Sequence, residues 1–149
     1  MIPGMKVIIV DGMGGGIGVQ LIARLKEALA AEAPKTAELI ALGTNSVATE
    51  RMVKAGAHRG ATGENAIRVS APLGRFILGP IGIVITNSMM GEITPVMADA
   101  ILRAPGERIL LPLQNDHFHL AGLESLPLAK MMDKAVEIFR ERLGAAKQP

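Results

Sequence analysis

Five glycines stand close together near the start of the chain, in the segment VDGMGGGIG. They follow an apolar, β-branched run typical of a buried strand and precede a pattern typical of a helix. In such a unit several backbone N–H groups can point at one anion, and the helix dipole adds a favourable potential. The segment therefore predicts a phosphate-binding loop for a cofactor, although glycines here could also serve only tight strand–helix packing. The loop comprises Asp11, Gly12, Met13, Gly14, Gly15, Gly16, Ile17 and Gly18.

The spacing of these glycines narrows the kind of loop. The dinucleotide pattern G-x-G-x-x-G does not fit, because Ile17 or Val19 stands where its third glycine should be, and the Gly-Lys-Ser/Thr of a Walker loop is missing. The pattern G-x-x-x-G-x-G fits Gly12, Gly16 and Gly18, and it resembles the cofactor loop of short-chain dehydrogenases. Those enzymes use a catalytic tyrosine, and this chain has no tyrosine, so it is not a standard member of that class.

Further polar and glycine-rich segments follow the later predicted strands. Parallel sheets bind ligands beyond the carboxyl ends of their strands, so these segments should border one crevice. We expect Gly43, Thr44 and Asn45 to meet a ribose, although the acidic residue usual at that place is missing. Gly79, Pro80 and Ile81 should border the other half of the ligand. The carboxylate of Asp11 would repel a pyrophosphate unless a cation or inward hydrogen bonds intervene.

Two acids in glycine-rich loops are candidates for proton transfer. Glu92 follows the polar cluster of Thr86, Asn87 and Ser88, and Asn87 is a further candidate for that chemistry. Glu64 stands beside the predicted crevice as well. The competing interpretations are a carboxylate in the first turn of a helix for Glu64, and an N-terminal staple or a surface charge for Glu92. We favour these interpretations over catalysis.

The segment DHFH carries three possible metal ligands, Asp116, His117 and His119. Alternate residues of a strand face the same side, which would bring the two histidines together. A zinc site needs three or four protein ligands, and no further one is evident. We therefore predict an exposed strand edge and no metal site.

Apolar periodicity and turn residues place strands and helices in alternation. Strands are predicted at 6–11, 37–42, 76–79 and 108–113, with a short edge strand at 117–123; helices are predicted at 17–32, 45–55, 64–70, 94–103 and 127–143. Residues 60–65 are predicted to form a loop, with a very short strand before it as an alternative. The run 81–90 is ambiguous between strand and buried helix. This alternation predicts an α/β fold with three layers, a mainly parallel sheet between helices on both faces.

Composition bounds the remaining possibilities. The 149 residues suit one domain, 1–149, and the absence of cysteine excludes a thiol nucleophile, a disulfide and thiolate-held metal. Every apolar run is shorter than a membrane span, which needs about 20 residues. With a net charge of +2 and only three aromatic residues, a nucleic-acid surface is not expected. We predict a soluble, cytoplasmic protein with methionines in its core and in a homo-oligomer contact.

Much of the chain also resembles a family of small bacterial proteins known only as a domain of unknown function. The matching segments are VDGMGGGIG, IALGTN, KAGA, GATGENAI, GPIGIVI, NSMMGEITPVMA and the late LPL. Members often carry glutamine at the position of Met13, and QNDHFHLAG matches least. The resemblance implies a Rossmann-like domain and supplies no activity.

Three hypotheses about function follow from the residues. The first is a Rossmann-like protein that binds NAD(P) or a related adenine nucleotide, with magnesium left open. The second is a small enzyme that acts on a phosphorylated or carboxylated metabolite, in a site completed at an oligomer interface. The third is a non-catalytic regulatory or assembly subunit.

Overall fold

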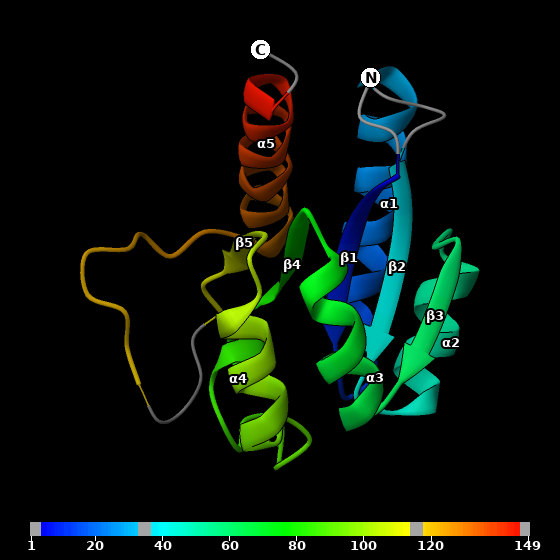
Figure 1. The fold of residues 1–149 in the computed structure, drawn as a ribbon. Helices are drawn as coiled ribbons and strands as arrows, with labels where there is room; N and C mark the ends of the chain where they lie inside the picture. The colour runs from blue at the N-terminus through cyan, green and yellow to red at the C-terminus, as the bar shows by residue number, and fades with distance from the viewer. Residues whose placement is uncertain (1–3, 33–36, 114–117, 147–149) are drawn as a thin grey trace.

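The protein is built on one five-stranded sheet in which all strands run parallel. The computed structural model describes residues 4–32, 37–113 and 118–146. The strands are β1 (Met5–Asp11), β2 (Ala37–Gly43), β3 (Arg59–Thr62), β4 (Phe76–Pro80) and β5 (Glu107–Leu111). Their order across the sheet is β3-β2-β1-β4-β5, so the chain reverses direction across the sheet between β1 and β4 (Figure 1). Ligands bind at such a switch point in open α/β sheets.

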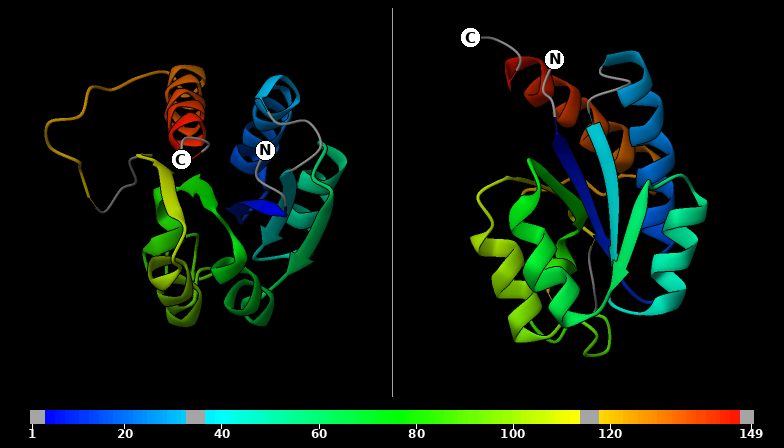
Figure 2. Two further views of the ribbon diagram at one scale, coloured as in Figure 1. Left: turned by 45° about the horizontal axis from the view of Figure 1, so that its top comes forward. Right: turned by 45° about the vertical axis from the view of Figure 1, so that its right-hand side comes forward.

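Helices cover both faces of this sheet. They are α1 (Gly16–Glu32), α2 (Ser46–Lys54), α3 (Glu64–Ser70), α4 (Pro95–Arg103) and α5 (Leu128–Ala146), with two short 3₁₀ helices, η1 (Ala71–Leu73) and η2 (Ile81–Val84). One core cluster joins the sheet to α1, α2 and α5, and the other joins it to α3 and α4. The views in Figure 2 show these two layers on opposite sides of the strands. The α/β, three-layer Rossmann-like fold predicted from the sequence is confirmed.

The sequence explains why the central elements form where they do. From Val7 to Val10 every side chain of β1 is fully buried, which accounts for its uninterrupted β-branched run. The Asn45 side chain accepts a hydrogen bond from the Ala48 amide and caps α2, and Thr94 caps α4 ahead of Pro95 in the same way. Across the sheet, the ring of Phe139 from α5 meets Phe76 edge-on at 5.0 Å between centroids. The two caps fix the beginnings of α2 and α4, and the ring contact packs α5 against the sheet.

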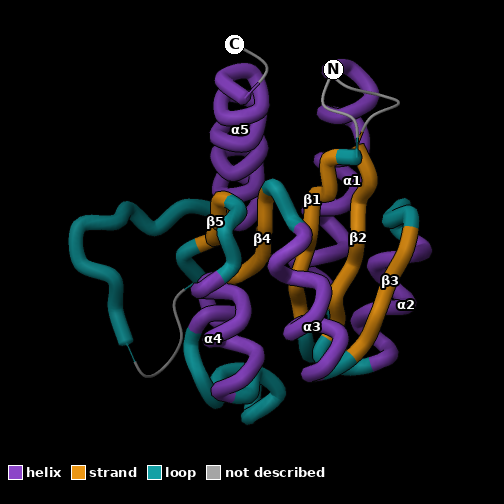
Figure 3. Tube along the Cα trace, viewed as in Figure 1, coloured by secondary structure: helices purple, strands orange, loops and turns teal. Residues whose placement is uncertain are grey.

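Three expectations about the elements were wrong. The segment 60–65 is not a loop, because Gly60–Thr62 pairs with β2 as part of β3, a strand whose exposed, polar residues hid it. The run 81–90 is neither strand nor buried helix: after η2 it forms turns, with a left-handed backbone at Asn87, Met89 and Met90. Of the predicted edge strand 117–123, the described part is a single bridge residue, Phe118, followed by loop (Figure 3).

The start of β1 and the end of α5 lie at the same end of the molecule, at the top of Figure 1. The strands point away from that end. Their carboxyl ends, at Asp11, Gly43 and Pro80, therefore meet at the opposite edge of the domain, where the glycine-rich loop lies. The fold collects the predicted site residues at this edge.

Candidate functional site

Within the glycine-rich loop, residues 12–15 make a tight turn between β1 and the first residue of α1. The Gly15 amide donates to the Gly12 carbonyl at 2.9 Å, and the Val19 amide donates back to the Gly15 carbonyl at 2.9 Å. Met13 and Gly15 both adopt a left-handed backbone, with φ of 51° and 74°. Gly15 is required there, because a Cβ atom would stand 2.9 Å from the Cα atom of Ala48. The loop is thus held against α2.

The carboxylate of Asp11 turns inward beneath this loop. Its Oδ1 accepts from the Gly12 amide and its Oδ2 from the Gly18 amide, each at 2.8 Å, and the side chain is buried. Burial raises the pKa of the Asp11 carboxyl above its ordinary value, while the hydrogen bonds from the loop amides act in the opposite direction. Asp11 therefore holds the loop to the first turn of α1. The sequence indicates that Asp11 repels a pyrophosphate unless a cation or inward hydrogen bonds intervene, and such inward hydrogen bonds are present.

Two glycines of the loop differ in what their missing side chains would meet. A Cβ atom on Gly18 would overlap the Met52 side chain and lie 3.1 Å from the Cβ atom of Asp11, so this glycine lets α1 approach β1 and α2. A Cβ atom on Gly16 would meet nothing within 4 Å, and Gly16 has no left-handed backbone. Packing explains Gly18, whereas no contact within the described protein requires glycine at Gly16.

A hollow of about 390 Å³ opens beside the loop. Besides the loop residues from Asp11 to Ile17, its lining comprises Gln20, Pro80, Met89, Leu113 and Leu128. It therefore lies across the switch point, between the carboxyl ends of β1 and β4, and it reaches the beginning of α5. Its size falls in the range of small-molecule sites, about 300–1,000 Å³. Among Gly79, Pro80 and Ile81, only Pro80 lines this hollow. The absence of a side chain at Gly79 lets β4 lie close to the Val10 carbonyl there, and Ile81 begins η2.

The crossover segment, which we define as residues 85–94, crosses to the loop from the far side of the crevice. Its Glu92 carboxylate atom Oε1 accepts three hydrogen bonds: from the Met13 amide at 2.9 Å, the Thr44 hydroxyl at 2.5 Å and the Asn45 side-chain amide at 2.8 Å. The Thr44 hydroxyl is the main cause that holds the pKa of Glu92 below its ordinary value. Glu92 thus joins the glycine-rich loop, the end of β2 and the crossover segment.

Backbone strain gathers in the same place. The non-glycine residues with positive φ in the described ranges are Met13, Asn87, Met89 and Met90. All four stand in the glycine-rich loop or the crossover segment. A left-handed backbone costs a non-glycine residue about 1–2 kcal/mol and persists where the surrounding contacts impose it. Such positions cluster at functional sites.

Thr44 and Asn45 link neighbouring loops through hydrogen bonds, a role that the sequence did not indicate. Asn45 accepts from the Ala48 amide and donates both to the Met13 carbonyl, at 2.9 Å, and to Glu92. Thr44 donates its hydroxyl to Glu92. Both side chains therefore tie loops together at the end of β2, beside Gly43, which packs closely on Thr49.

A model of one protein family matches residues 6–144, nearly the whole chain. The family is described as a domain of unknown function, DUF3842. The chain belongs to the DUF3842 family. Neither a curated protein nor a solved structure matches it significantly. The resemblance found in the sequence is thereby confirmed, and the site of this DUF3842 domain has to be interpreted from its own residues.

The other sequence candidates of this DUF3842 domain lie apart from the hollow. Glu64 is exposed and begins α3, as its competing interpretation predicted, and the side chain of Asn87 is exposed in the crossover segment. Asp116 and His117 fall outside the described residues. Within the described residues no group of three or more histidine, aspartate or glutamate side chains is placed to hold a metal ion. No described helix is both long and apolar enough to cross a membrane.

The methionines divide between core and surface. Met97 and Met132 are buried in the two core clusters, as predicted, whereas Met90 is 92% exposed at the tip of the crossover segment. The predicted homo-oligomer contact and cytoplasmic location stay predictions.

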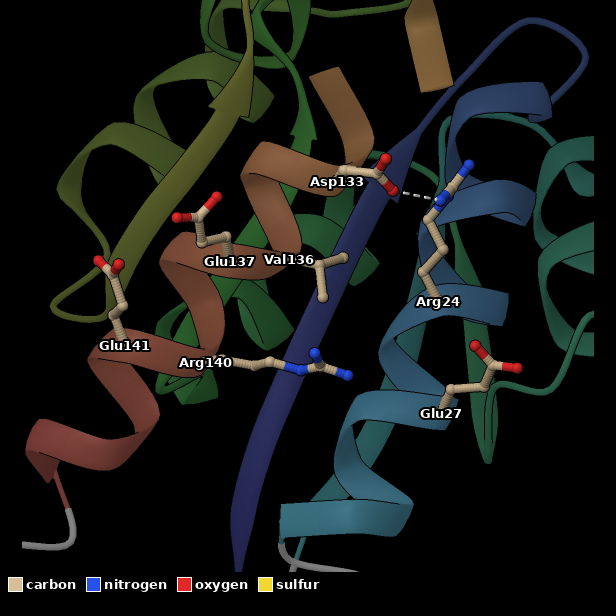
Figure 4. Close-up of a pocket in the computed structure, with 7 residues that line it drawn as sticks. All are labelled: Arg24, Glu27, Asp133, Val136, Glu137, Arg140 and Glu141. Atoms are coloured by element: carbon tan, nitrogen blue, oxygen red, sulfur yellow. Dashed lines mark hydrogen bonds and ion pairs between the residues drawn. The ribbon is translucent and has the colours of Figure 1, made fainter. Parts of the chain in front are cut away.

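A second hollow, of about 430 Å³, lies between α1 and α5 (Figure 4). Most of its lining is charged, and Arg24 forms an ion pair with Asp133 at 2.8 Å across it. The cleft carries no glycine loop and is lined by the helices alone, away from the ends of the strands. We therefore place the candidate site at the glycine-rich loop.

Proposed function

We propose that this DUF3842 domain binds NAD(P) or a related adenine nucleotide in the hollow beside its glycine-rich loop. The observation that carries the proposal is Gly16. Its missing side chain would point into open space at the beginning of a 17-residue helix, and no described contact requires glycine there. A ligand that approaches the backbone closely would require it.

The electrostatics of the loop support an anionic ligand. The N-terminus of α1 is the positive end of the helix dipole. None of the residues in its first turn is acidic, and the carboxylate that reaches this turn is that of Asp11. The amides of Gly12 and Gly18 donate to the Asp11 carboxylate and reduce its repulsion of an anion bound at the loop. The amides of Gly14 and Gly16 donate to no acceptor among the described residues, which leaves donors for phosphate oxygens.

Magnesium would enter such a site with the nucleotide. Both oxygens of Asp11 already accept hydrogen bonds from backbone amides, so its carboxylate does not point toward a bound magnesium ion. Magnesium commonly binds through phosphate oxygens of a substrate and one or two carboxylates. We therefore expect a small additional effect of magnesium on triphosphates and none on the protein alone.

The test is a thermal-shift panel on freshly purified protein, preceded by native mass spectrometry to find a retained ligand. The panel contains NAD, NADP, ATP, FMN and coenzyme A, each with and without magnesium. Binding at a hundred times Kd stabilises a protein by about 2.7 kcal/mol, so a specific nucleotide should raise the Tm by several degrees. No response to any adenine nucleotide would refute the proposal.

A second candidate function is favoured by Glu92. Its three hydrogen bonds tie the glycine-rich loop to the end of β2, and the hollow itself is lined by the loop together with Pro80, Leu113 and Leu128. A small phosphorylated or carboxylated metabolite would fill that hollow without extending toward β2. Stabilisation by such small anions, in the absence of any response to nucleotides, would favour this alternative.

A further inference from the structure

The end of β2 contains no acidic residue, yet a carboxylate stands beside it. Dinucleotide-binding sheets commonly carry an aspartate or glutamate at this end, where it accepts hydrogen bonds from the ribose hydroxyls of adenosine. Here Gly43, Thr44 and Asn45 occupy that end of the strand. The Glu92 carboxylate reaches them from the crossover segment, 48 positions after Thr44.

The three hydrogen bonds of Glu92 leave one of its oxygens unused. All of them go to Oε1, and no donor among the described residues reaches Oε2. The side chain is half-buried, so part of it is open to solvent, and it stands outside the lining of the hollow. Oε1 also lies close to the position that a Cβ atom on Gly12 would take, 3.1 Å away, so the carboxylate stands directly over the first glycine of the loop.

We propose that Glu92 recognises the adenosine ribose, with Oε2 accepting from its hydroxyls, and so selects an unmodified ribose over a 2′-phosphorylated one. This inference rests on the proposed nucleotide function. It assigns to the crossover segment the role that the second strand has in other dinucleotide sites. It also names the ligand class as NAD or another nucleotide with a free ribose diol.

Charge supports this selection. The three donors on Oε1 favour the ionised form of Glu92 and keep its pKa below the ordinary value, so the carboxylate is charged at neutral pH. A 2′-phosphate beside it would meet like charge. One cation, Arg51 of α2, also borders the loop, where its guanidinium donates to the Gly14 carbonyl. If Arg51 governed the choice instead, a 2′-phosphate would be preferred.

Glu92→Gln gives a specific test. Glutamine has nearly the same shape, and its oxygen can keep the three hydrogen bonds of Oε1, but its NH₂ group replaces Oε2 and cannot accept from a hydroxyl. Binding of ADP, 2′-deoxy-ADP, NAD and NADP is measured by isothermal titration calorimetry on wild type and variant. Glu137→Gln, on the charged cleft between α1 and α5, is the matched control.

Wild type should bind ADP at least about tenfold more tightly than 2′-deoxy-ADP, because a hydrogen bond to a charged group is lost. Glu92→Gln should lose this difference and should bind NADP at least as well as wild type does. Equal losses on ADP and 2′-deoxy-ADP would show that Glu92 only holds the loop, and tighter binding of NADP than NAD by wild type would also overturn the inference. Absence of binding by all four nucleotides would refute the proposed function itself, and this inference with it.

Discussion

Replacing Gly16 by valine should separate ligand binding from folding. The Cβ atom of the new residue meets nothing within 4 Å, and the backbone of Gly16 is not left-handed. Valine also has a slightly better helix propensity than glycine, by a few tenths of a kcal/mol. We therefore expect the free energy of unfolding of Gly16→Val to lie within about 0.5 kcal/mol of that of wild type.

The same substitution should weaken nucleotide binding strongly. The added methyl groups occupy the open space next to the amides that a phosphate would approach. Loss of one or two hydrogen bonds to a charged phosphate costs about 2–4 kcal/mol, which lowers affinity by about 30-fold or more. Gly18→Val is the matched control, because its Cβ atom overlaps Met52 and should destabilise the fold by about 1–3 kcal/mol.

Urea denaturation followed by far-ultraviolet circular dichroism measures stability, since the chain contains neither tryptophan nor tyrosine as a fluorescent probe. Calorimetric titration with the nucleotide found by the thermal-shift panel measures affinity. Wild-type affinity in Gly16→Val would refute the ligand interpretation of this glycine. Unfolding of Gly16→Val would refute the claim that its side-chain position is open.

Two further predictions concern the framework of the site. The pKa of Glu92 is lowered by its hydrogen bonds, so the stability that Glu92 contributes is present above pH 4.5, its ordinary value, and disappears as pH falls through the lower pKa of the folded state. Urea denaturation between pH 3 and 7 should therefore show a steeper loss toward acid in wild type than in Glu92→Gln, and parallel curves would contradict this. Phe139→Ala should lower the free energy of unfolding by about 3–5 kcal/mol, because it removes the fully buried ring that packs α5 against Phe76, and a loss below 1 kcal/mol would be inconsistent with that packing.

The fold was predictable where local signals and packing agree. The run from Val7 to Val10 identified β1, and the apolar faces of α1 and α5 gave these helices within one to three residues of their bounds. Thr94 followed by Pro95 fixed the beginning of α4, because cap and first-turn preferences depend only on neighbouring residues. In these elements the residues next to one another in the sequence determine the secondary structure.

Elements with weak local signals were missed. β3 contributes only four residues, Arg59–Thr62, none of them fully buried, and its pairing with β2 supports it rather than its own composition. The apolar run after β4 was ambiguous because its conformation depends on contacts of the crossover segment, including the Asn87 amide with the Ile93 carbonyl at 2.7 Å. Left-handed methionines cannot be inferred from propensity, which disfavours them.

The candidate site, like the fold, was predictable from the sequence only in part. Residue types and spacing located the glycine-rich loop. Of the residues at the later strand ends, Pro80 lines the hollow and Asn45 contacts the loop through the Met13 carbonyl. The role of Glu92 was not predictable, because its partners Met13 and Thr44 lie 79 and 48 positions away. Its place among polar residues next to a glycine was the one signal available. It made Glu92 a candidate for proton transfer, with a surface charge as the favoured interpretation, and it did not indicate a link between loops.

The positions of the start of β1 and of the end of α5 also bear on how this protein can be handled. β1 begins and α5 ends at the edge of the domain opposite to the glycine-rich loop. An affinity tag, a fused reporter or an attachment to a sensor surface at either end would therefore leave the crevice facing solution. Ligand libraries can be screened on immobilised protein with either end as the anchor, and agreement between the two orientations would show that the attachment does not disturb binding.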